Sequence, residues 1–379
     1  MLALLFLFAT IAHAIVVSGP SGPWPVSYRV VELTDKSRWD PYAPKDSPHK
    51  RRILTSFFLP IHADQRTCKV DKIDYLPPKT TEAYGGVAAG LGLPNTIFEG
   101  FELEFCKASS KKQRPLPVVI FSPGFGGSRL LSSAQAQSLA SRGNVVITVD
   151  HPYEATIVEF PDGTVVYGSN LDSTNNETVT TAAGVRSQDV SFLIDQILKP
   201  SSLGHGFSGR LDTSRIFVYG HSLGGATSAL VALNDDRVLG GLDMDGFLWG
   251  PVTEAGLDVP FFIVGAGSTA NDTLNYGGFM DKLNGVNALL TMDGMQHMSF
   301  FDIPLLISLR DDIPPELEPV LAAAFGAIPG KRVAAIVDSI LGMVTRFLFE
   351  GKARPLCTVE DRIPELVVVE RDLKGACRN

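Results

Sequence analysis

The stretch "RIFVYGHSLGGATSALVALN" (residues 215–234) places Ser222 between a run typical of a strand and a run typical of a helix. The run before the serine is short, apolar and rich in β-branched and aromatic residues, whereas the run after it is rich in Ala and Leu. Gly220, Ser222 and Gly224 form a G-x-S-x-G pattern, which is found where a serine hydroxyl projects from a tight strand-to-helix turn. Glycine on both sides would allow the helix to approach the strand without a Cβ clash. We therefore predict that Ser222 is a nucleophile on such a turn.

The context of this pattern matters, because the chain has 36 glycines and roughly one shuffled chain in four would contain G-x-S-x-G by chance. Short apolar runs recur along the chain, and several of the gaps between them have the length and pattern of helices. Continuous apolar strands alternating with helices indicate a parallel sheet that is covered on both faces. We therefore predict an α/β fold of the α/β-hydrolase type, with a mostly parallel, doubly wound sheet and helices on both faces. The runs are "PVVIF" (117–121), "NVVITVD" (144–150), "RIFVYG" (215–220), "VLGGLDMD" (238–245), "PFFIVGAG" (260–267) and "ALLTMDG" (288–294).

A serine nucleophile needs a base that removes its proton and an acid that orients the base. In this fold the three residues follow one another in the order serine, acid, histidine. His297 is the one histidine of the chain beyond Ser222, and it follows a strand-like run in a segment that reads as a loop. His221 directly precedes the serine and would point the other way. We therefore predict that His297 is the base.

Three aspartates at strand ends are candidates for the acid. The fold in general places the acid after the strand that precedes Asp272, but Asp272 lies inside a glycosylation sequon, and a glycan would crowd a buried site. Asp245 opens the glycine-containing turn "DGFLWGP" (245–251), which suits an inward-facing carboxylate. Spacing favours Asp245 and leaves Asp272 and Asp243 as alternatives.

Two backbone N–H groups are needed to bind the oxyanion of a tetrahedral intermediate, one from the residue after the serine and one from a loop after an earlier strand. Leu223 supplies the first. The loop "FSPGFGGSR" (121–129) follows the first core strand, and Phe125 is its natural donor. Residues just past the predicted acid are candidates for the wall of an acyl pocket, with ordinary core packing as the alternative; they are Phe247, Leu248 and Trp249.

Composition excludes several classes of partner. The chain is 45% hydrophobic, carries a formal net charge of −8, and has no block of Lys and Arg. Nucleic-acid binding is not expected, because it requires a basic footprint that neutralises phosphates. The chain has no C-x-x-C pair or His cluster, so we predict no metal site and no cofactor.

The amino-terminal residues predict export from the cell. Residues 1–14 contain an apolar run and end in Ala-His-Ala, which fits a signal peptide cleaved after Ala14. The alternative is an uncleaved anchor, but the apolar run stops at Val17, short of the roughly 20 residues that span a bilayer. A secreted, extracellular protein is expected.

In an oxidising compartment the four cysteines are expected to form disulfides, because a small, even number of cysteines is typical of disulfide-bonded proteins there. They allow three connectivities, of which Cys68–Cys106 with Cys357–Cys377 closes the two shortest loops. Two sequons could carry glycans in the same compartment, at Asn176 and Asn271.

We expect a single domain over residues 15–379. It begins with an extension of strands and loops (15–115), in which "VSYRVVEL" and "RILTSFFLPI" could pair and the part from about 62 onward is turn-rich. It ends with a helical segment (306–379) that contains an apolar stripe within 331–351. Such a stripe either packs on the sheet or makes transient contact with a lipid surface, and its weakly basic polar face favours packing.

Four motifs taken in order resemble the secreted platelet-activating-factor acetylhydrolases, the group-VII phospholipases A2. They are "FSPGFGGSR", "GHSLGGAT", "LDMDGFLWGP" and "MDGMQHMSFFD", and the likeness extends over roughly residues 25–305. The resemblance implies Asp245 as the acid, because in that family the acid lies shortly after the nucleophile. It also implies Phe125 and Leu223 as oxyanion donors, and metal-independent hydrolysis of short acyl esters. The chain departs from the family at Gly246, where an aromatic residue is usual, and at Pro123, where a histidine is common.

These inferences predict a secreted serine carboxylic-ester hydrolase that acts on a small lipid or ester substrate. Ser222 would attack the ester carbonyl while His297, held by Asp245, accepts the proton, and water would then release the acyl group. A broader carboxylesterase, lipase or polyester hydrolase could use the same residues. A binding protein on the same fold is the alternative outside enzymes, and such proteins usually lack the nucleophile or the base.

Overall fold

The computed structural model describes most of the chain, and the account below concerns the described residues: 14–17, 19–61, 68–107, 114–204, 207, 210–267 and 275–378. Residues 1–13 of the predicted signal peptide lie outside them. The same is true of the sequon at Asn271 and of the alternative acid Asp272.

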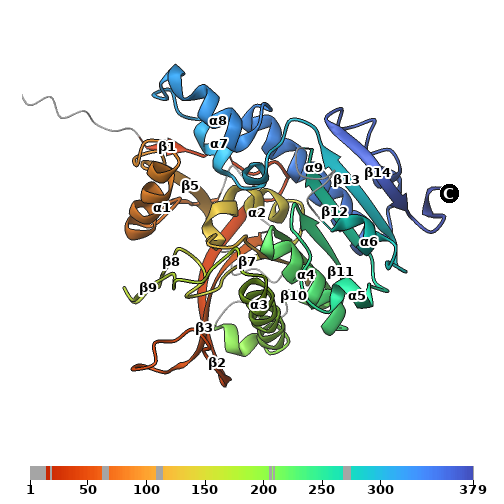
Figure 1. Ribbon diagram of the computed structural model, residues 1–379, viewed down its shortest axis with the longest axis horizontal. Helices are drawn as coiled ribbons and strands as arrows, with labels where there is room; N and C mark the ends of the chain where they lie inside the picture. Colours follow the sequence, from red (N-terminus) through yellow and green to blue (C-terminus); the bar gives the residue numbers. More distant parts are fainter. Residues whose placement is uncertain are drawn as a thin grey trace, which may run out of the picture.

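A nine-stranded sheet forms the centre of the molecule, with the strand order β14-β13-β12-β11-β10-β6-β7-β3-β2 (Figure 1). The strands from β7 to β13 in this order run parallel, whereas β3 pairs antiparallel with both β7 and β2, and β14 pairs antiparallel with β13. This mostly parallel sheet confirms the predicted α/β fold. The strands are β2 Val26–Trp39, β3 Lys50–Pro60, β6 Leu116–Ser122, β7 Val145–Asp150, β10 Leu211–His221, β11 Val238–Met244, β12 Phe261–Ala266, β13 Asn287–Met292 and β14 Leu366–Asp372.

Helices cover both faces of the sheet because the apolar strands bury both sets of alternating side chains. In β6, Val119 and Phe121 pack in the same cluster as α2 and α9. Val118 and Ile120 of the same strand pack with α3 on the opposite face. The helices are α2 Ser133–Ala140, α3 Asn176–Ile197, α4 Leu223–Asn234, α5 Val252–Ala255, α6 Tyr276–Met280 and α9 Gly330–Glu350.

The amino-terminal extension contains more regular structure than its turn-rich sequence predicted. The strands β2 and β3 pair as expected, but a separate small sheet follows, formed by β1 Ile15–Val16, β5 Phe101–Cys106 and β4 Val70–Asp74. Between β4 and β5 lies the helix α1 Pro78–Gly90. Its glycines weaken the helical signal, yet Gly85 is required by packing, since a Cβ there would lie 2.1 Å from the backbone oxygen of Asn95. A short hairpin, β8 Ile157–Glu159 with β9 Val165–Tyr167, follows β7.

The carboxyl-terminal segment is helical only in part, so this prediction was incomplete. It contains α7 Ile303–Ile307, α8 Glu318–Phe325, α9 and α10 Arg354–Cys357, but then β14 returns to pair with β13 at the edge of the central sheet. In α9 the predicted apolar stripe is buried in the main core, including Val333, Ile336, Val337 and Ile340. The packing interpretation therefore fits α9.

Two disulfides join the pairs that close the shortest loops, Cys68–Cys106 and Cys357–Cys377. The first ties the segment before β4 to the end of β5. The second ties α10 to the end of the chain beyond β14. Asn176 is exposed at the first turn of α3, and its glycosylation stays a prediction.

Candidate active site

Ser222 sits on a sharp turn between β10, which ends at His221, and α4, which begins at Leu223. Its φ is +55°, a left-handed conformation that is costly for a residue with a side chain and is concentrated at functional sites. A Cβ on Gly220 would lie 2.1 Å from the backbone of Gly224, and one on Gly224 would lie 1.9 Å from the backbone oxygen of Ser122. Both glycines are therefore needed for the helix to pack this closely on the strands.

Asp245 follows β11 and holds the imidazole of His297. Its Oδ2 accepts a hydrogen bond from His297 Nδ1 at 2.7 Å, and its Oδ1 accepts one from the backbone N–H of Ala266 at 2.7 Å. The carboxylate is buried, and its residue also has a positive φ, +56°. Because Nδ1 donates to the carboxylate, Nε2 of His297 is left with a lone pair that can accept a proton.

The alternative acid Asp243 has a different environment. Its Oδ1 accepts the N–H of Gly246 at 2.9 Å, and a Cβ on Gly225 would lie 1.6 Å from the same oxygen. Burial, with the charge of Asp245 as a lesser cause, raises the pKa of Asp243 well above its usual range. Within the described part of the chain, the carboxylate hydrogen-bonded to His297 is that of Asp245.

His297 begins a short 3₁₀ turn, His297–Phe300, after β13, and its side chain remains 42% exposed. His221 supports it from below, since His221 Nε2 lies 2.8 Å from the backbone oxygen of His297 and the two ring centroids are 4.5 Å apart. Burial lowers the pKa of His221 well below its usual range, so the ring is neutral and its Nε2–H donates to that oxygen. Sequence reasoning set His221 aside and missed this supporting contact.

The segment that carries His297 is anchored by Asp302, which is buried at the start of α7. Its carboxylate accepts hydrogen bonds from the N–H groups of Ala134 and Gln135 at 2.7 and 3.1 Å, and from the hydroxyl of Tyr75 at 2.7 Å. Despite these three donors, burial raises the pKa of Asp302 to about 7.

This raised pKa gives a test of stability against pH. The folded protein holds the Asp302 proton more tightly than the unfolded chain, so the contribution of this group to the free energy of unfolding decreases as pH rises. The decrease is about 1.4 kcal/mol per pH unit between about pH 4 and about pH 7. Asp302→Asn cannot titrate and removes this dependence. Urea unfolding of both proteins should therefore show a stability difference, wild type minus variant, that decreases with pH. A difference that increases would mean that the three hydrogen bonds outweigh burial.

The predicted oxyanion donors lie on either side of the turn at Ser222. Phe125 belongs to the loop after β6, and Leu223 is the first residue of α4. The loop packs closely against the turn, because a Cβ on Gly124 would lie only 3.2 Å from the Cβ of Ser222. No hydrogen bond between described residues uses the N–H of Phe125 or of Leu223. Leu223 is the first residue of α4, where an N–H has no partner within the helix, so both N–H groups are available for a ligand oxygen.

A pocket of about 260 Å³ brings these groups together. Phe247 and Trp249 form an aromatic wall, with ring centroids 4.6 Å apart. Ser173 and Val179 also line the pocket, and nothing in the sequence pattern indicated them. The pocket residues are Phe125, Ser173, Val179, Ser222, Leu223, Asp245, Phe247, Trp249 and His297.

Leu248 does not line this pocket, so that prediction was wrong. Its side chain is buried in the core with α4 and β12, and its backbone N–H and C=O bond to the side chain of Asn275. In an irregular turn, consecutive side chains point in different directions. Phe247 and Trp249 reach the pocket while the residue between them faces inward.

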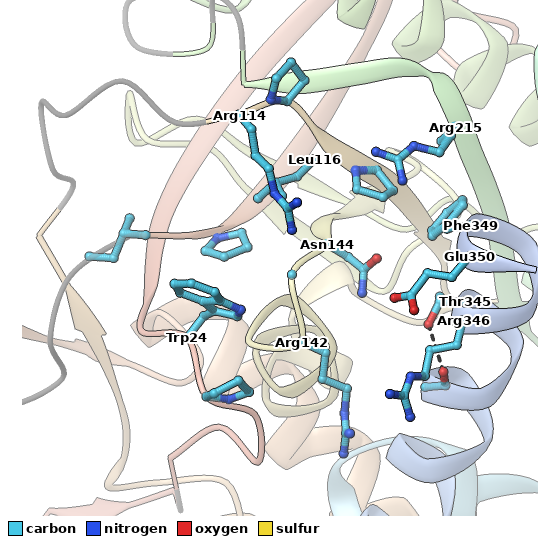
Figure 2. Close-up of a pocket in the computed structure, with 17 residues that line it drawn as sticks. Trp24, Arg114, Leu116, Arg142, Asn144, Arg215, Thr345, Arg346, Phe349 and Glu350 are labelled. Carbon is cyan, nitrogen blue, oxygen red and sulfur yellow. Dashed lines mark hydrogen bonds between the residues drawn. The ribbon is translucent and has the colours of Figure 1, made fainter. Parts of the chain in front are cut away.

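A larger cavity of about 590 Å³ lies near the amino ends of the parallel strands, where Leu116, Asn144 and Arg215 are among the residues that line it (Figure 2). Four arginines line it. Arg142 pairs with Asp338, and Arg215 pairs with Asp212. The cavity holds none of the predicted catalytic residues. The smaller pocket is therefore the candidate active site. Across the described ranges, no group of three or more His, Cys, Asp or Glu is placed to hold a metal ion.

Comparison with known proteins gives concordant results. The family model of platelet-activating factor acetylhydrolase, isoform II, matches residues 100–165 and 184–309. A probable 1-alkyl-2-acetylglycerophosphocholine esterase of Arthroderma benhamiae is 30% identical over 260 residues, which are 66% of this chain and 63% of that protein. The platelet-activating factor acetylhydrolase of Cavia porcellus is 26% identical over 76% of this chain and 73% of its own length. A ferulic acid esterase from Streptomyces cinnamoneus has a similar structure, with a TM-score of 0.78 and 26% identity over 94% of this chain and all of that one. The chain thus spans a little under two thirds of the length of the fungal relative.

Proposed function

The chain belongs to the platelet-activating factor acetylhydrolase isoform II family, and from this premise we propose that it is a serine carboxylic-ester hydrolase for short-acyl glycerophospholipids. One observation carries the proposal. The hydrogen-bonded pair of Asp245 and His297 shares a pocket with Ser222 on its strained turn and with the two free N–H groups of Phe125 and Leu223.

The proposed mechanism assigns each group a step. Ser222 Oγ attacks the ester carbonyl while His297 Nε2 accepts the hydroxyl proton, and Asp245 stabilises the imidazolium that forms. The N–H groups of Phe125 and Leu223 bind the oxyanion. The imidazolium then protonates the leaving alkoxide. Water, activated by the same histidine, releases the acid from the acyl-enzyme.

The size and lining of the pocket support a short acyl group. At about 260 Å³ it lies at or below the lower end of the range for small-molecule sites, and its aromatic wall limits the length of a chain that enters. The names of the fungal and guinea-pig relatives refer to esters with a 2-acetyl group or to platelet-activating factor. A second candidate function is hydrolysis of an aromatic acid ester, which the wall of Phe247 and Trp249 and the ferulic acid esterase neighbour favour.

A panel of substrates tests this proposal. The purified chain is labelled with a fluorophosphonate probe and assayed on 1-alkyl-2-acetylglycerophosphocholine, on a long-chain diacylglycerophosphocholine, on methyl ferulate and on short p-nitrophenyl esters. We expect labelling and the highest kcat/KM for the acetyl phospholipid. A preference for methyl ferulate would establish the second candidate instead. Neither labelling nor turnover would mean a binding protein on this fold.

The aromatic wall makes a specific prediction about acyl length. Trp249→Ala enlarges the pocket, and one added or missing methylene in an apolar pocket changes discrimination by roughly 10-fold to 200-fold. We expect the ratio of kcat/KM for a p-nitrophenyl hexanoate over the acetate to rise by about tenfold. Trp39→Ala is the control, because Trp39 is 63% exposed on β2. An unchanged ratio in Trp249→Ala would place the acyl group elsewhere in the pocket.

We also propose that the protein is secreted, glycosylated at Asn176 and Asn271, and in transient contact with lipid surfaces. Two disulfides support an extracellular location, because such bonds persist in oxidising compartments. Lipid contact is supported by α8 rather than α9, because Phe325 is the one buried residue of this apolar helix. Mass spectrometry of the protein from culture medium tests cleavage after Ala14 and both sequons.

A further inference from the structure

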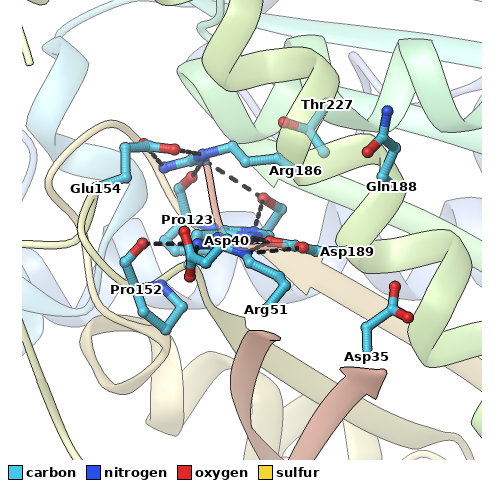
Figure 3. Close-up of polar contacts among 12 residues, drawn as sticks. Asp35, Asp40, Arg51, Pro123, Pro152, Glu154, Arg186, Gln188, Asp189 and Thr227 are labelled. Carbon is cyan, nitrogen blue, oxygen red and sulfur yellow. Dashed lines mark hydrogen bonds and ion pairs between the residues drawn. The ribbon is translucent and has the colours of Figure 1, made fainter. Parts of the chain in front are cut away.

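The loop that carries Phe125 is held from below by a buried arginine on α3. Arg186 donates from Nη1 to the backbone oxygen of Pro123 (Figure 3). It also donates from Nη2 to the backbone oxygen of Gly124 at 3.0 Å. Nη1 also lies 3.5 Å from Ser122 Oγ, while Nε and Nη2 donate to the two carboxylate oxygens of Glu154. The side chains of Arg186 and Glu154 are each 1% exposed. A guanidinium therefore sits directly beneath the predicted oxyanion loop.

Because the peptide bond is planar, the contact between Arg186 and the carbonyl of Gly124 also sets the direction of the next N–H group, that of Phe125. The oxygen of Gly124 and the N–H of Phe125 belong to one peptide unit, and the described backbone contains no cis bond. In a planar trans peptide, C=O and N–H point in opposite directions. The carbonyl of Gly124 is held by Arg186 and also by the N–H of Gly127 at 2.9 Å, so the N–H of Phe125 is directed away from α3. No described residue accepts it, and Phe125 and Ser222 line the same pocket.

The charge of the guanidinium acts in the same direction. A charged donor on the Gly124 oxygen polarises the peptide, and hydrogen bonds in series strengthen one another in a low-dielectric interior. The N–H of Phe125 thereby becomes a stronger donor to an oxyanion. Glu154 balances the charge of Arg186, so the arginine can remain buried.

We propose that Arg186, balanced by Glu154, is a positioning residue that orients and polarises the Gly124–Phe125 peptide so that its N–H serves the oxyanion site. The inference rests on the proposed ester hydrolysis. Arg186 itself touches no substrate, since it acts through the backbone of the loop.

A neighbouring buried cluster provides a contrast. Ser122 Oγ lies 3.0 Å from His151 Nε2, and His151 Nδ1 lies 2.9 Å from Asp189 Oδ2. The order of residue types is that of a catalytic triad, but all three are buried and the set does not line the candidate pocket. Arg51 binds Asp189, Asp40 and the backbone oxygen of Pro152 (Figure 3). It donates to no carbonyl of the oxyanion loop among the described residues.

The test compares Arg186→Lys with Arg51→Lys, two equally conservative changes at arginines whose residues are each 1% exposed. Lysine keeps the charge but loses the planar fork that reaches two carbonyls and a carboxylate at once. For each purified variant, fluorophosphonate titration gives the concentration of reactive active sites. The variant is then assayed on p-nitrophenyl acetate and on the matching thionoester. Sulfur accepts hydrogen bonds poorly, so the thionoester gains little from an oxyanion site. The ratio of the two rates therefore reports on that site, whereas general destabilisation leaves it unchanged.

We expect Arg186→Lys to lower kcat for the oxygen ester by roughly 10²–10³, with little change in KM, and to lower the oxygen-to-sulfur rate ratio by a similar factor. Arg51→Lys should keep the wild-type ratio. The double variant Arg186→Met with Glu154→Leu removes the pair without leaving a buried unpaired charge. It should fold and show the same loss of ratio. A wild-type ratio in folded Arg186→Lys and in the double variant would overturn the inference, as would an equal loss in Arg51→Lys. Absence of turnover by the wild type would overturn the proposed function itself, and the inference with it.

Discussion

Replacing Ser222 with alanine is expected to lower kcat for a short p-nitrophenyl ester by roughly 10⁴–10⁶ while the fold is retained. The loss is large because the acyl-enzyme cannot form, and His297 has no hydroxyl to activate. A small residual rate should remain, since the N–H groups of Phe125 and Leu223 still bind the oxyanion during direct attack by water. Alanine has no added cost at this turn, because the backbone strain at φ +55° is already present with serine.

The control for this variant, Ser228→Ala, lies on α4, the helix that follows Ser222. Ser228→Ala removes a buried hydroxyl that donates to the backbone oxygens of Gly225 and Leu242 and does not line the pocket. Far-ultraviolet circular dichroism confirms folding of both variants. Ser228→Ala should keep turnover and covalent labelling by a fluorophosphonate, and Ser222→Ala should lose both. Labelling of Ser222→Ala at the wild-type level would show that the nucleophile lies elsewhere.

The sequence predicted the central fold and the turn at Ser222 because both depend on local patterns. Apolar strands buried on both faces appear as continuous apolar runs, and the close approach of helix to strand requires glycine at fixed spacing. The helix α1 was not predicted because its glycines weaken the helical signal, although Gly85 is required for packing against Asn95. The edge strand β14 escaped notice because it lies in a segment dominated by helical periodicity.

Supporting contacts between distant residues that belong to no motif could not be predicted. Arg186 reads as one polar residue of an amphipathic helix, and nothing local indicates that it binds carbonyls 62 and 63 positions earlier. Leu248 was misplaced for a related reason, since an irregular turn has no periodicity that tells which of three successive side chains faces the pocket. The sequence thus predicted the groups proposed to do the chemistry, while the groups that hold them became visible only in the structure.

Replacing each of the three candidate acids with asparagine distinguishes them, because only the catalytic acid should show a large loss of kcat. Asp245→Asn is expected to lower kcat by about 10⁴, because the asparagine amide can donate to Nδ1 of His297 and stabilise the tautomer whose Nε2 carries the proton. That nitrogen could then no longer accept the proton of Ser222. The protein should still fold, since the side-chain oxygen of asparagine can accept the N–H of Ala266 in place of Asp245 Oδ1.

Asp243→Asn is the matched control, because both carboxyl groups are buried and lie two residues apart. Burial raises the pKa of Asp243 well above its usual range, so at neutral pH its carboxyl is protonated and an amide is a near replacement. We therefore expect kcat to change little. The same substitution at Asp272, the third candidate, should also leave kcat close to that of the wild type. If Asp243→Asn or Asp272→Asn lost activity while Asp245→Asn kept it, the hydrogen bond of 2.7 Å between Asp245 and His297 would be structural rather than catalytic. The acid would then have to reach the imidazole from another strand end.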